Sequence, residues 1–480
     1  MKNILFATSE AVPFIKTGGL ADVAGSLPKY FDKRYFDIRV ILPKYACMKQ
    51  EWKDKMEYVT HFYMDLGFKN CYVGIMQMQY DGIQFYFIDN EYYFSGPKPY
   101  DSAPWDLEKF AFFSKAVLSV LPVIGFRPDI IHCHDWQTGL IPVYLHDSFQ
   151  SDPFFWGIKT IFTIHNLKFQ GTWSVDTIKG FSGLSDYYFT SDKLEAYGNG
   201  NLLKGGLVYA DRITTVSRSY ASEIRMPFYG EGLDGLLRAR SKQLSGIVNG
   251  IDIQLWNPST DPEIPYHFDK VNIAVQKKKA KMALQEELGL EKNPDVMMVG
   301  VVSRLTWQKG FYLLMEQLDA LCAAPIQLVI LGSGESQIEN KFRELEDGNK
   351  GKICFYYGYN ESLAHRIYAA SDLFLMPSLF EPCGISQLCS MRYGTLPLVR
   401  ETGGLKDTVD AYNEYEKSGN GFSFENYDSN ELIHTLYYAC DVYYNRKEDW
   451  EMLQRNALNT DVSWQQSAKT YSLLYDELVD

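Results

Sequence analysis

The sequence predicts an α/β protein built on two mainly parallel β-sheets, and three observations support this. Short apolar runs alternate with segments of helical periodicity along the whole chain, which is the pattern of repeated βαβ units. The runs form two series, separated by a stretch with three prolines, Trp256–Tyr266. The length of 480 residues is sufficient for two domains. We therefore expect one domain over residues 1–255 and a second over residues 256–462, with Trp256–Tyr266 as the linker.

The first series contains runs rich in Ile and Val, which are typical of strands buried on both faces of a sheet. The predicted strands are Asn3–Thr8, Ile38–Leu42, Ile130–Cys133, Thr160–Ile164, Arg212–Val216 and Gly246–Val248. Two further runs, Tyr72–Gln79 and Gln84–Ile88, are separated by Asp81-Gly82, a dipeptide that favours a β-hairpin turn.

The second series begins near Val296 and has the same character. Its predicted strands are Met297–Val302, Gln327–Leu331, Ile353–Tyr357, Leu373–Met376 and Leu396–Val399. Helical segments such as Phe311–Leu321 and Glu361–Ala370 lie between them. The two series therefore predict two doubly wound domains. Such folds bind ligands at the carboxyl ends of their strands.

Composition excludes several classes of function. The net charge of −13 gives no general attraction to nucleic acid or to an anionic membrane. No stretch approaches the roughly 18 apolar residues that span a bilayer, and residues 1–10 do not have the pattern of a signal peptide. The eight cysteines form no Cys-x-x-Cys pair, and scattered thiols fit a reducing compartment. We expect a cytoplasmic protein.

A glycine pair follows the first predicted strand, in Lys16-Thr17-Gly18-Gly19. Adjacent glycines allow a backbone to approach a ligand closely, and the helix expected after them offers free N–H groups to an anion. A tight surface turn is the alternative interpretation of the same residues.

The sequence of this loop is Lys-Thr-Gly-Gly-Leu-Ala-Asp-Val, at residues 16–23. It resembles the signature of bacterial glycogen synthases and plant starch synthases. Further segments match that family in the same order along the chain. They are His132-Cys133-His134-Asp135-Trp136, Thr163-Ile164-His165-Asn166-Leu167, Lys204-Gly205-Gly206, Asn249-Gly250-Ile251-Asp252, Ser303-Arg304-Leu305, Gln308-Lys309-Gly310, Pro377–Gly384, Tyr393-Gly394-Thr395 and Glu401–Leu405. Ser463-Trp464 with Tyr471 and Tyr475 resembles the closing helix of the family.

The resemblance implies a GT-B fold, in which two Rossmann-like doubly wound domains face an interdomain cleft. It implies transfer of glucose, with retention, from a nucleotide diphosphate glucose to the non-reducing end of an α-1,4-glucan. ADP-glucose is expected ahead of UDP-glucose, and the departure of residues 94–105 from the common family pattern leaves the donor open. The first domain is then the acceptor side, with the helix 463–480 packing back on it, and the second binds the nucleotide sugar. No cofactor is implied.

The departing nucleoside diphosphate develops negative charge, which fixed cations stabilise. The resemblance assigns this role to Lys16, Arg304 and Lys309, although solvated surface positions are the usual fate of such residues. Backbone contacts to the donor are implied for Gly18, Gly19, Gly384 and the turn Thr402-Gly403-Gly404. Asp22 would order the first of these loops.

The resemblance places Glu381 and His165 at the donor sugar and Asp135 on the acceptor side. A surface acid and a structural histidine are the alternatives for Glu381 and His165. The remaining implied donor or nucleotide contacts are Asn166, Asn249, Tyr359 and Cys383.

A retaining glycosidase uses two carboxylates about 5 Å apart, one as the nucleophile. The residue eight positions after Glu381 is Cys389, so a second glutamate is missing there. A front-side attack is therefore favoured, and a covalent intermediate stays open. We expect His132 and His134 to face opposite sides of their strand, and we expect no metal site.

Two alternatives belong to other classes. A nicotinamide-dependent dehydrogenase would need Gly-x-Gly-x-x-Gly, and Gly332-Ser333-Gly334 continues without the third glycine. A non-catalytic glycan-binding scaffold would have no need of the three cations.

Overall fold

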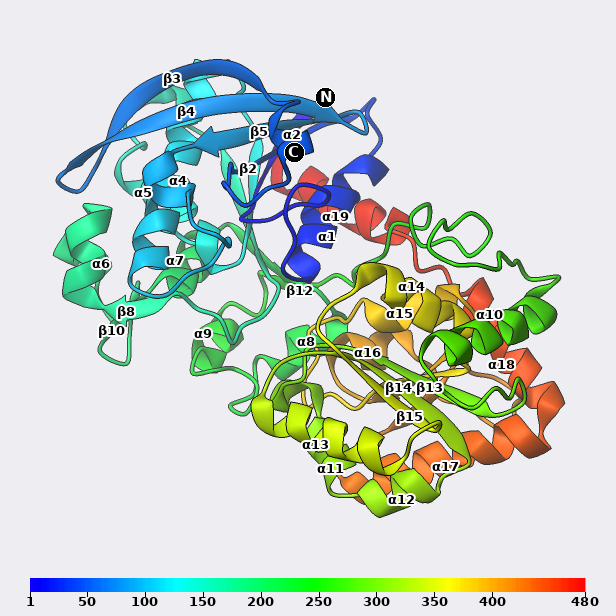
Figure 1. The fold of residues 1–480 in the computed structure, drawn as a ribbon. Coiled ribbons are helices and arrows are strands. Elements are labelled where there is room, and N and C mark those ends of the chain that lie inside the picture. The colour runs from blue at the N-terminus through cyan, green and yellow to red at the C-terminus, as the bar shows by residue number, and fades with distance from the viewer. Residues whose placement is uncertain (480) are drawn as a thin grey trace. The chain divides into compact units, whose positions relative to one another are not determined.

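The computed structural model describes residues 1–479, and these form two compact units (Figure 1). The first unit comprises Met1–Val216, Ala221–Asn249 and the chain from Trp464 onward. The second comprises Ser217–Tyr220 and Gly250–Ser463. The first unit is therefore discontinuous in sequence, because the whole of the second main segment is inserted before its last helix. No helix among the described residues combines the length and the apolar character that a bilayer crossing requires.

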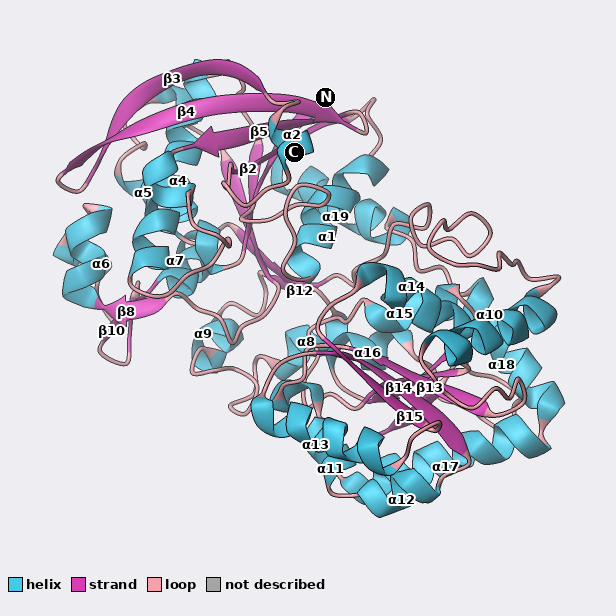
Figure 2. Ribbon diagram, viewed as in Figure 1, coloured by secondary structure: helices cyan, strands magenta, loops and turns pink. Residues whose placement is uncertain are grey.

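The first unit is built on a nine-stranded sheet, whose strands lie in the order β12-β11-β7-β6-β1-β2-β5-β4-β3 (Figure 2). Its pairs are parallel except where β4 meets β5 and β3. The strands are β1 (Lys2–Ala7), β2 (Phe36–Pro43), β3 (Glu57–Leu66), β4 (Lys69–Tyr80), β5 (Ile83–Asp89), β6 (Ile130–His134), β7 (Lys159–Ile164), β11 (Arg212–Thr215) and β12 (Leu244–Gly246).

Most of the predicted strands of this unit are confirmed. The last one, expected at Gly246–Val248, begins two residues earlier as β12. The β4–β5 hairpin is also confirmed: Tyr80 pairs with Ile83, and Asp81 and Gly82 have φ of 49° and 72°. Positive φ at both turn residues suits the right-handed twist of the two strands. The edge strand β3 was not predicted.

Helices cover both faces of this sheet, α1 and α19 on one face and α4, α5 and α7 on the other (Figure 1). The helices of the unit are α1 (Gly19–Ser26), α2 (Gln50–Lys53), α3 (Glu91–Phe94), α4 (Trp105–Val123), α5 (Leu140–Asp147), α6 (Val175–Ser182), α7 (Leu202–Tyr209), α9 (Asp234–Ala239) and α19 (Gln465–Val479). A small sheet of β8 (Thr172–Ser174), β10 (Asn199–Asn201) and β9 (Glu195–Ala196) lies beside them.

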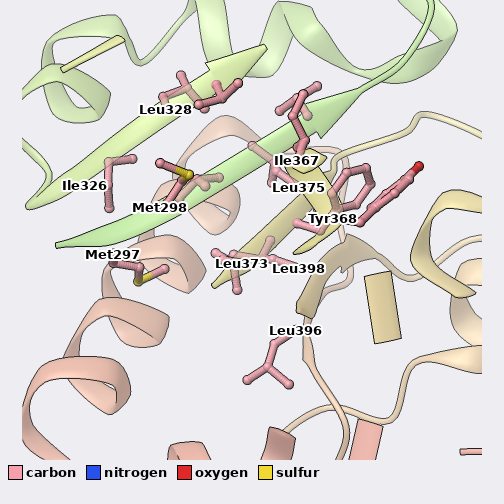
Figure 3. Close-up of a cluster of buried hydrophobic side chains, with 14 of the residues drawn as sticks. Met297, Met298, Ile326, Leu328, Ile367, Tyr368, Leu373, Leu375, Leu396 and Leu398 are labelled. Atoms are coloured by element: carbon pink, nitrogen blue, oxygen red, sulfur yellow. The ribbon is translucent and has the colours of Figure 1, made fainter. Parts of the chain in front are cut away.

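The second unit contains a six-stranded parallel sheet in the order β15-β14-β13-β16-β17-β18. Its strands are β13 (Met297–Val302), β14 (Ile326–Gly332), β15 (Ile353–Tyr357), β16 (Leu373–Met376), β17 (Leu396–Arg400) and β18 (Phe422–Phe424). The five predicted strands are confirmed, and β18 was not predicted. Figure 3 shows part of the core that they form, in which Met298, Leu328 and Leu373 come from three different strands.

Helices also cover both faces of the second sheet, with α11, α12, α13 and α17 on one face and α14 and α15 on the other, beside α10 (Figure 1). The helices are α10 (Ile273–Glu287), α11 (Phe311–Met315), α12 (Leu318–Ala323), α13 (Ser336–Gly348), α14 (Glu361–Ala370), α15 (Ser386–Arg392), α16 (Gly403–Thr408), α17 (Ser429–Asn445) and α18 (Lys447–Asn459); α8 (Arg218–Glu223) begins in this unit.

One predicted helix is wrong in its extent. The segment Phe311–Leu321 is two helices, α11 and α12, because the chain leaves helical geometry at Gln317, with φ −124° and ψ 31°. The side-chain amide of Gln317 donates hydrogen bonds to Ser429 and Asn430 at the start of α17. A long-range contact thus overrides the local periodicity.

The segment Trp256–Tyr266, expected as a linker, is anchored in the second unit. The Trp256 ring stacks on His365, with centroids 4.0 Å apart. The buried Asp261 carboxylate receives hydrogen bonds from His365, at 2.7 Å, and from Tyr393. Burial opposes ionisation of Asp261, but these hydrogen bonds outweigh it and lower its pKa. The chain passes between the units at 249/250 and 463/464, and it also enters the second unit briefly over Ser217–Tyr220.

Candidate active site

In the first unit, the predicted site residues come from three adjacent strands. Lys16 follows β1, Asp135 follows β6 and His165 follows β7, and these strands are neighbours in one parallel sheet. Their carboxyl ends meet at the same edge of the sheet, where α/β folds bind ligands.

The glycine pair stands where β1 gives way to α1. Gly18 occupies the N-cap position in extended backbone, and no side chain caps the helix. A Cβ placed on Gly18 would meet no atom within 4 Å, so the space above this turn is open. Lys16 Nζ lies 2.9 Å from Asp22 Oδ1 in the first turn of α1, which fixes the lysine beside the glycines.

Glu10 is a residue of this loop that sequence reasoning missed. It is almost fully buried, and its carboxylate receives hydrogen bonds from the backbone N–H of Thr17, from the Thr17 hydroxyl at 2.7 Å and from the Tyr100 hydroxyl. A buried carboxylate needs such partners. An acidic residue directly after an apolar strand was the feature of the sequence that could have indicated Glu10. Its hydrogen bonds with Thr17 hold the loop that precedes Gly18.

Asp135 holds the start of the next loop. Its Oδ1 accepts the backbone N–H of His165 at 2.7 Å, and its own φ is +58°, which is uncommon for a residue other than glycine. Burial raises the pKa of Asp135 to about 7, although the N–H groups of His165 and Asn166 act in the opposite direction. The contact that Asp135 makes is therefore with the loop that carries His165.

Three histidines form a buried cluster beside this loop. His134 Nδ1 and His165 Nε2 are 2.9 Å apart, and the rings of His132 and His134 stack with centroids separated by 4.3 Å. The prediction that His132 and His134 face opposite sides is wrong, because residues two apart along a strand share a face. Burial lowers the pKa of His132 and of His165 to about 3, so both are neutral at pH 7. Within residues 1–479, no group of three or more His, Cys, Asp or Glu residues is placed to hold a metal ion.

In the second unit, the predicted residues again follow adjacent strands. Arg304 and Lys309 come after β13, Glu381 after β16 and Gly403 after β17. Lys309 Nζ lies 2.6 Å from Glu381 Oε2, and Ser378 Oγ donates to the same oxygen at 3.1 Å. Arg304 is exposed. A cation and a carboxylate thus meet at the carboxyl edge of the sheet.

The glycine turn after β17 packs directly on the Glu381 loop. Gly403 has φ +47°, and a Cβ there would lie 1.8 Å from the carbonyl oxygen of Glu381. The N–H of Gly404 donates to that oxygen at 3.1 Å. From the end of β17, buried Arg400 donates to the carbonyl groups of Ser378, at 2.8 Å, and Leu379. Two loops that carry predicted site residues are therefore locked together.

The other predicted residues lie in different surroundings. Cys383 is buried beside Gly404, Gly384 has φ +76°, and Thr402 is the N-cap of α16. Tyr359 follows the edge strand β15 and is 70% exposed. Asn166 is half-buried after His165, and Asn249 is a buried residue at the end of a segment of the first unit.

Both units of the chain contain segments that match families of known proteins. Residues 3–239 match the family model of the starch synthase catalytic domain, and residues 284–451 match that of glycosyl transferases group 1. Curated glycogen synthases of Lachnospira eligens and Lachnoclostridium phytofermentans are 59% and 56% identical, each over 100% of both chains. This chain belongs to the glycogen and starch synthase family.

Solved structures agree with this assignment. The catalytic domain of starch synthase IV from Arabidopsis thaliana, a structure with ADP and acarbose bound, has a TM-score of 0.91 and 33% identity over 100% of this chain and 99% of that one. A sucrose-phosphate synthase from Thermosynechococcus elongatus, at 16% identity and TM-score 0.62, shares the fold alone. The predicted GT-B fold and the predicted hexosyltransferase of the glycogen synthase type are confirmed. The family uses a nucleotide-sugar donor and a glucan acceptor.

Proposed function

We propose that this glycogen synthase homologue transfers glucose, with retention of configuration, from ADP-glucose to the non-reducing end of an α-1,4-glucan. The pairing of Lys309 with Glu381 carries the proposal. In the donor, the phosphate and the sugar are adjacent. Lys309 and Glu381 are also adjacent, so the cation can bind the phosphate while the carboxylate binds the sugar.

The donor phosphates bind the cations. Lys309, Arg304 and Lys16 are the cations proposed to stabilise the charge that develops on the departing ADP. Before the donor binds, Lys309 is neutralised by Glu381 and Lys16 by Asp22, at 2.6 and 2.9 Å. These acids keep both lysines oriented until a phosphate competes for them. In each glycine turn, the missing side chain allows the backbone to approach a phosphate closely.

The sugar contacts involve Glu381, His165 and Asn166. Glu381 accepts hydrogen bonds from glucose hydroxyls, and neutral His165 with its backbone carbonyl lies at the anomeric centre. A carboxylate held by both Lys309 and Ser378 is a poor nucleophile, which supports a front-side attack. The bond from C1 to the phosphate oxygen breaks, C1 bonds to the acceptor hydroxyl, and that hydroxyl's proton passes to the departing phosphate. ADP leaves with the bonding electron pair.

The base and the compartment complete the proposal. Exposed Tyr359 offers a ring for the adenine to stack on, and the related starch synthase IV structure holds ADP. No resident cofactor takes part, because the nucleotide sugar is itself a substrate. All eight cysteines are free thiols, which supports a cytoplasmic location.

A transfer assay with glycogen primer tests the proposal. Purified protein receives ADP-glucose or UDP-glucose, and released nucleotide and incorporated glucose are both measured. We expect incorporation from ADP-glucose with higher kcat/KM, and α-1,4 linkages in the product by NMR. Equal use of UDP-glucose would overturn the donor assignment, β-linked product would overturn retention, and glycogen binding without transfer would support the scaffold alternative.

A further inference from the structure

The contact between His134 and His165 joins two neighbouring strands just where the proposed sugar contact begins. His134 is the last residue of β6 and pairs with Thr163 of β7, so His165 lies two residues further along the partner strand. His134 Nδ1 and His165 Nε2 are 2.9 Å apart, which is hydrogen-bond distance. One of these two nitrogens must carry the proton between them.

Packing fixes the His134 ring. It has no exposed surface, and it stacks on His132 while the Phe6 ring lies against it, with centroids 5.2 Å apart. His132 is itself held at both nitrogens, by the Tyr475 hydroxyl at 2.8 Å and by Thr163 Oγ1 at 2.6 Å. The His134 ring thus has a fixed orientation toward His165.

The protons can be assigned from the other nitrogen of His134. Burial keeps both imidazoles neutral, so each ring carries one N–H. His134 Nε2 is buried and has no hydrogen-bond partner among the described residues. If His165 donated to His134, this Nε2 would carry a hydrogen with no acceptor. Buried N–H groups without a partner are rarer than buried acceptors without one.

We propose that His134 is a positioning residue, which donates from Nδ1 to Nε2 of His165 and so fixes His165 as the Nδ1–H tautomer. His165 then presents an N–H, rather than a lone pair, on its remaining ring nitrogen. That N–H is a donor for an oxygen of the nucleotide sugar, such as a hydroxyl near the anomeric carbon. This inference rests on the proposed role of His165 for its effect on catalysis, but not for the tautomer itself.

Three substitutions of nearly equal size separate donor, acceptor and apolar character at this position. In His134→Asn the amide N–H stands close to the position of Nδ1 and preserves the donor. His134→Asp offers only an acceptor, and His134→Leu offers neither. We expect Asn to retain most of kcat, and Asp and Leu to lower kcat about 10- to 100-fold, the usual scale for a supporting residue. His146→Leu, at an exposed position of α5, is the control and leaves kcat unchanged.

The tautomer is read directly by nitrogen NMR of protein labelled with 15N-histidine, with His165→Gln to assign the signal. We expect an Nδ1–H signature for His165 in the unmodified protein, kept in His134→Asn and lost in His134→Asp and His134→Leu. An Nε2–H signature in the unmodified protein overturns the inference, even if every variant fails to fold. So does a tautomer that His134→Leu leaves unchanged. A tautomer that shifts while kcat stays constant leaves the positioning intact and instead overturns the proposed role of His165.

Discussion

Lys309 and Glu381, two residues of the proposed donor site, form an ion pair that stabilises both charges in the absence of a ligand. Both side chains are largely buried, and an unpaired charge there would be costly. Pairing removes that cost without a ligand, and a phosphate can then replace the carboxylate as the partner of the lysine. The same logic applies to Lys16 and Asp22 in the first unit.

We expect Lys309→Ala to lower kcat by about a hundredfold or more, because one fixed charge at a developing anion contributes roughly 3 kcal/mol. Arg304→Ala should have a comparable effect. Initial rates of glucose incorporation measure both. Lys341→Ala removes a partly exposed lysine of α13, paired with Glu344, and serves as the control with normal turnover. A near-normal rate of glucan synthesis by Lys309→Ala would contradict the proposal that Lys309 binds the diphosphate of the donor.

The buried histidines predict a loss of stability on mild acidification. The pKa of His132 and of His165 is about 3 when folded and 6.5 ordinarily, so only the unfolded chain gains these protons as pH falls below about 6.5. Each contributes up to ~1.4 kcal/mol of lost stability per pH unit. Asp135, with a pKa of about 7 against 3.8, acts in the opposite sense, since stability falls as pH rises from about 4 to 7. One aspartate does not offset two histidines.

Urea unfolding at pH 7.5, 6.5 and 5.5 measures this dependence. The free energy of unfolding should fall between pH 6.5 and 5.5, and His132→Gln should reduce that slope by about one proton. His146→Gln, at an exposed position, should leave the slope as it is. Equal slopes in all three proteins would contradict the effect of burial on these pKa values.

At the residue scale, the sequence indicated individual candidate residues but not the partners that the structure gives them. Lys309 and Glu381 were assigned separately, and nothing in a one-dimensional pattern indicates that they pair across 72 residues. Glu10 was missed because its partners, Thr17 and Tyr100, come from two different loops. The prediction that His132 and His134 face opposite sides was a mistake about strand geometry. Their spacing of two residues already implied that they share a face.

At the scale of elements, the buried strands were predictable and the exposed ones were not. β13 and β14 are continuous apolar runs, because both faces of their sheet are covered. β3 is an edge strand with mostly exposed residues, and its sequence EYVTHFYMDL gives no apolar run. The three-residue strand β18 is too short to stand out from its surroundings.

The two glycine turns differ in how closely they are packed, and this predicts two different kinds of defect. Gly403→Ala should destabilise the second unit and abolish transfer, because its Cβ would overlap the carbonyl oxygen of Glu381 and φ is +47°. Gly348→Ala, at the end of α13 with no atom near its Cβ, is the control and should be neutral or slightly stabilising. Thermal unfolding and transfer rates measure both. Normal stability of Gly403→Ala would show that the two loops are not locked together.

Gly18→Ala should behave in the opposite way. Its backbone is extended and its Cβ position is open, so the midpoint of thermal unfolding should not change. Donor affinity should fall if the open space receives a phosphate. Calorimetric titration with ADP-glucose distinguishes the outcomes, and unchanged affinity would remove Gly18 from the proposed donor site.

At the scale of the whole molecule, the first unit is completed by a helix from the other end of the chain. Tyr475 of α19 is fully buried, stacks on Phe31 with centroids 5.5 Å apart and hydrogen-bonds to His132 at 2.8 Å. That this helix packs on the first unit was predicted from the family resemblance, because periodicity alone does not indicate where a terminal helix packs.

Tyr475→Ala should therefore destabilise the first unit, although residue 475 is far from it in sequence. Removal of a large buried aromatic ring costs about 3–5 kcal/mol. Urea unfolding followed by fluorescence and by protection of β6 amides from hydrogen exchange measures the loss. Tyr415 is 90% exposed, so Tyr415→Ala should have no effect. Equal stability of the two variants would mean that α19 contributes nothing to the first unit.

The discontinuity of the first unit also determines the order in which a newly synthesised chain can finish folding. The ribosome releases residues 250–463 before the residues from Trp464 onward, which carry α19 and complete the first unit. At 5–20 residues per second, the first unit waits roughly 10–40 s for its last helix. The segment made second can thus mature first, which reverses the usual amino-to-carboxyl order. A nascent chain that stops short of α19 would carry a complete second unit and an unfinished first one, and would be open to chaperones and proteases before it could act on a sugar.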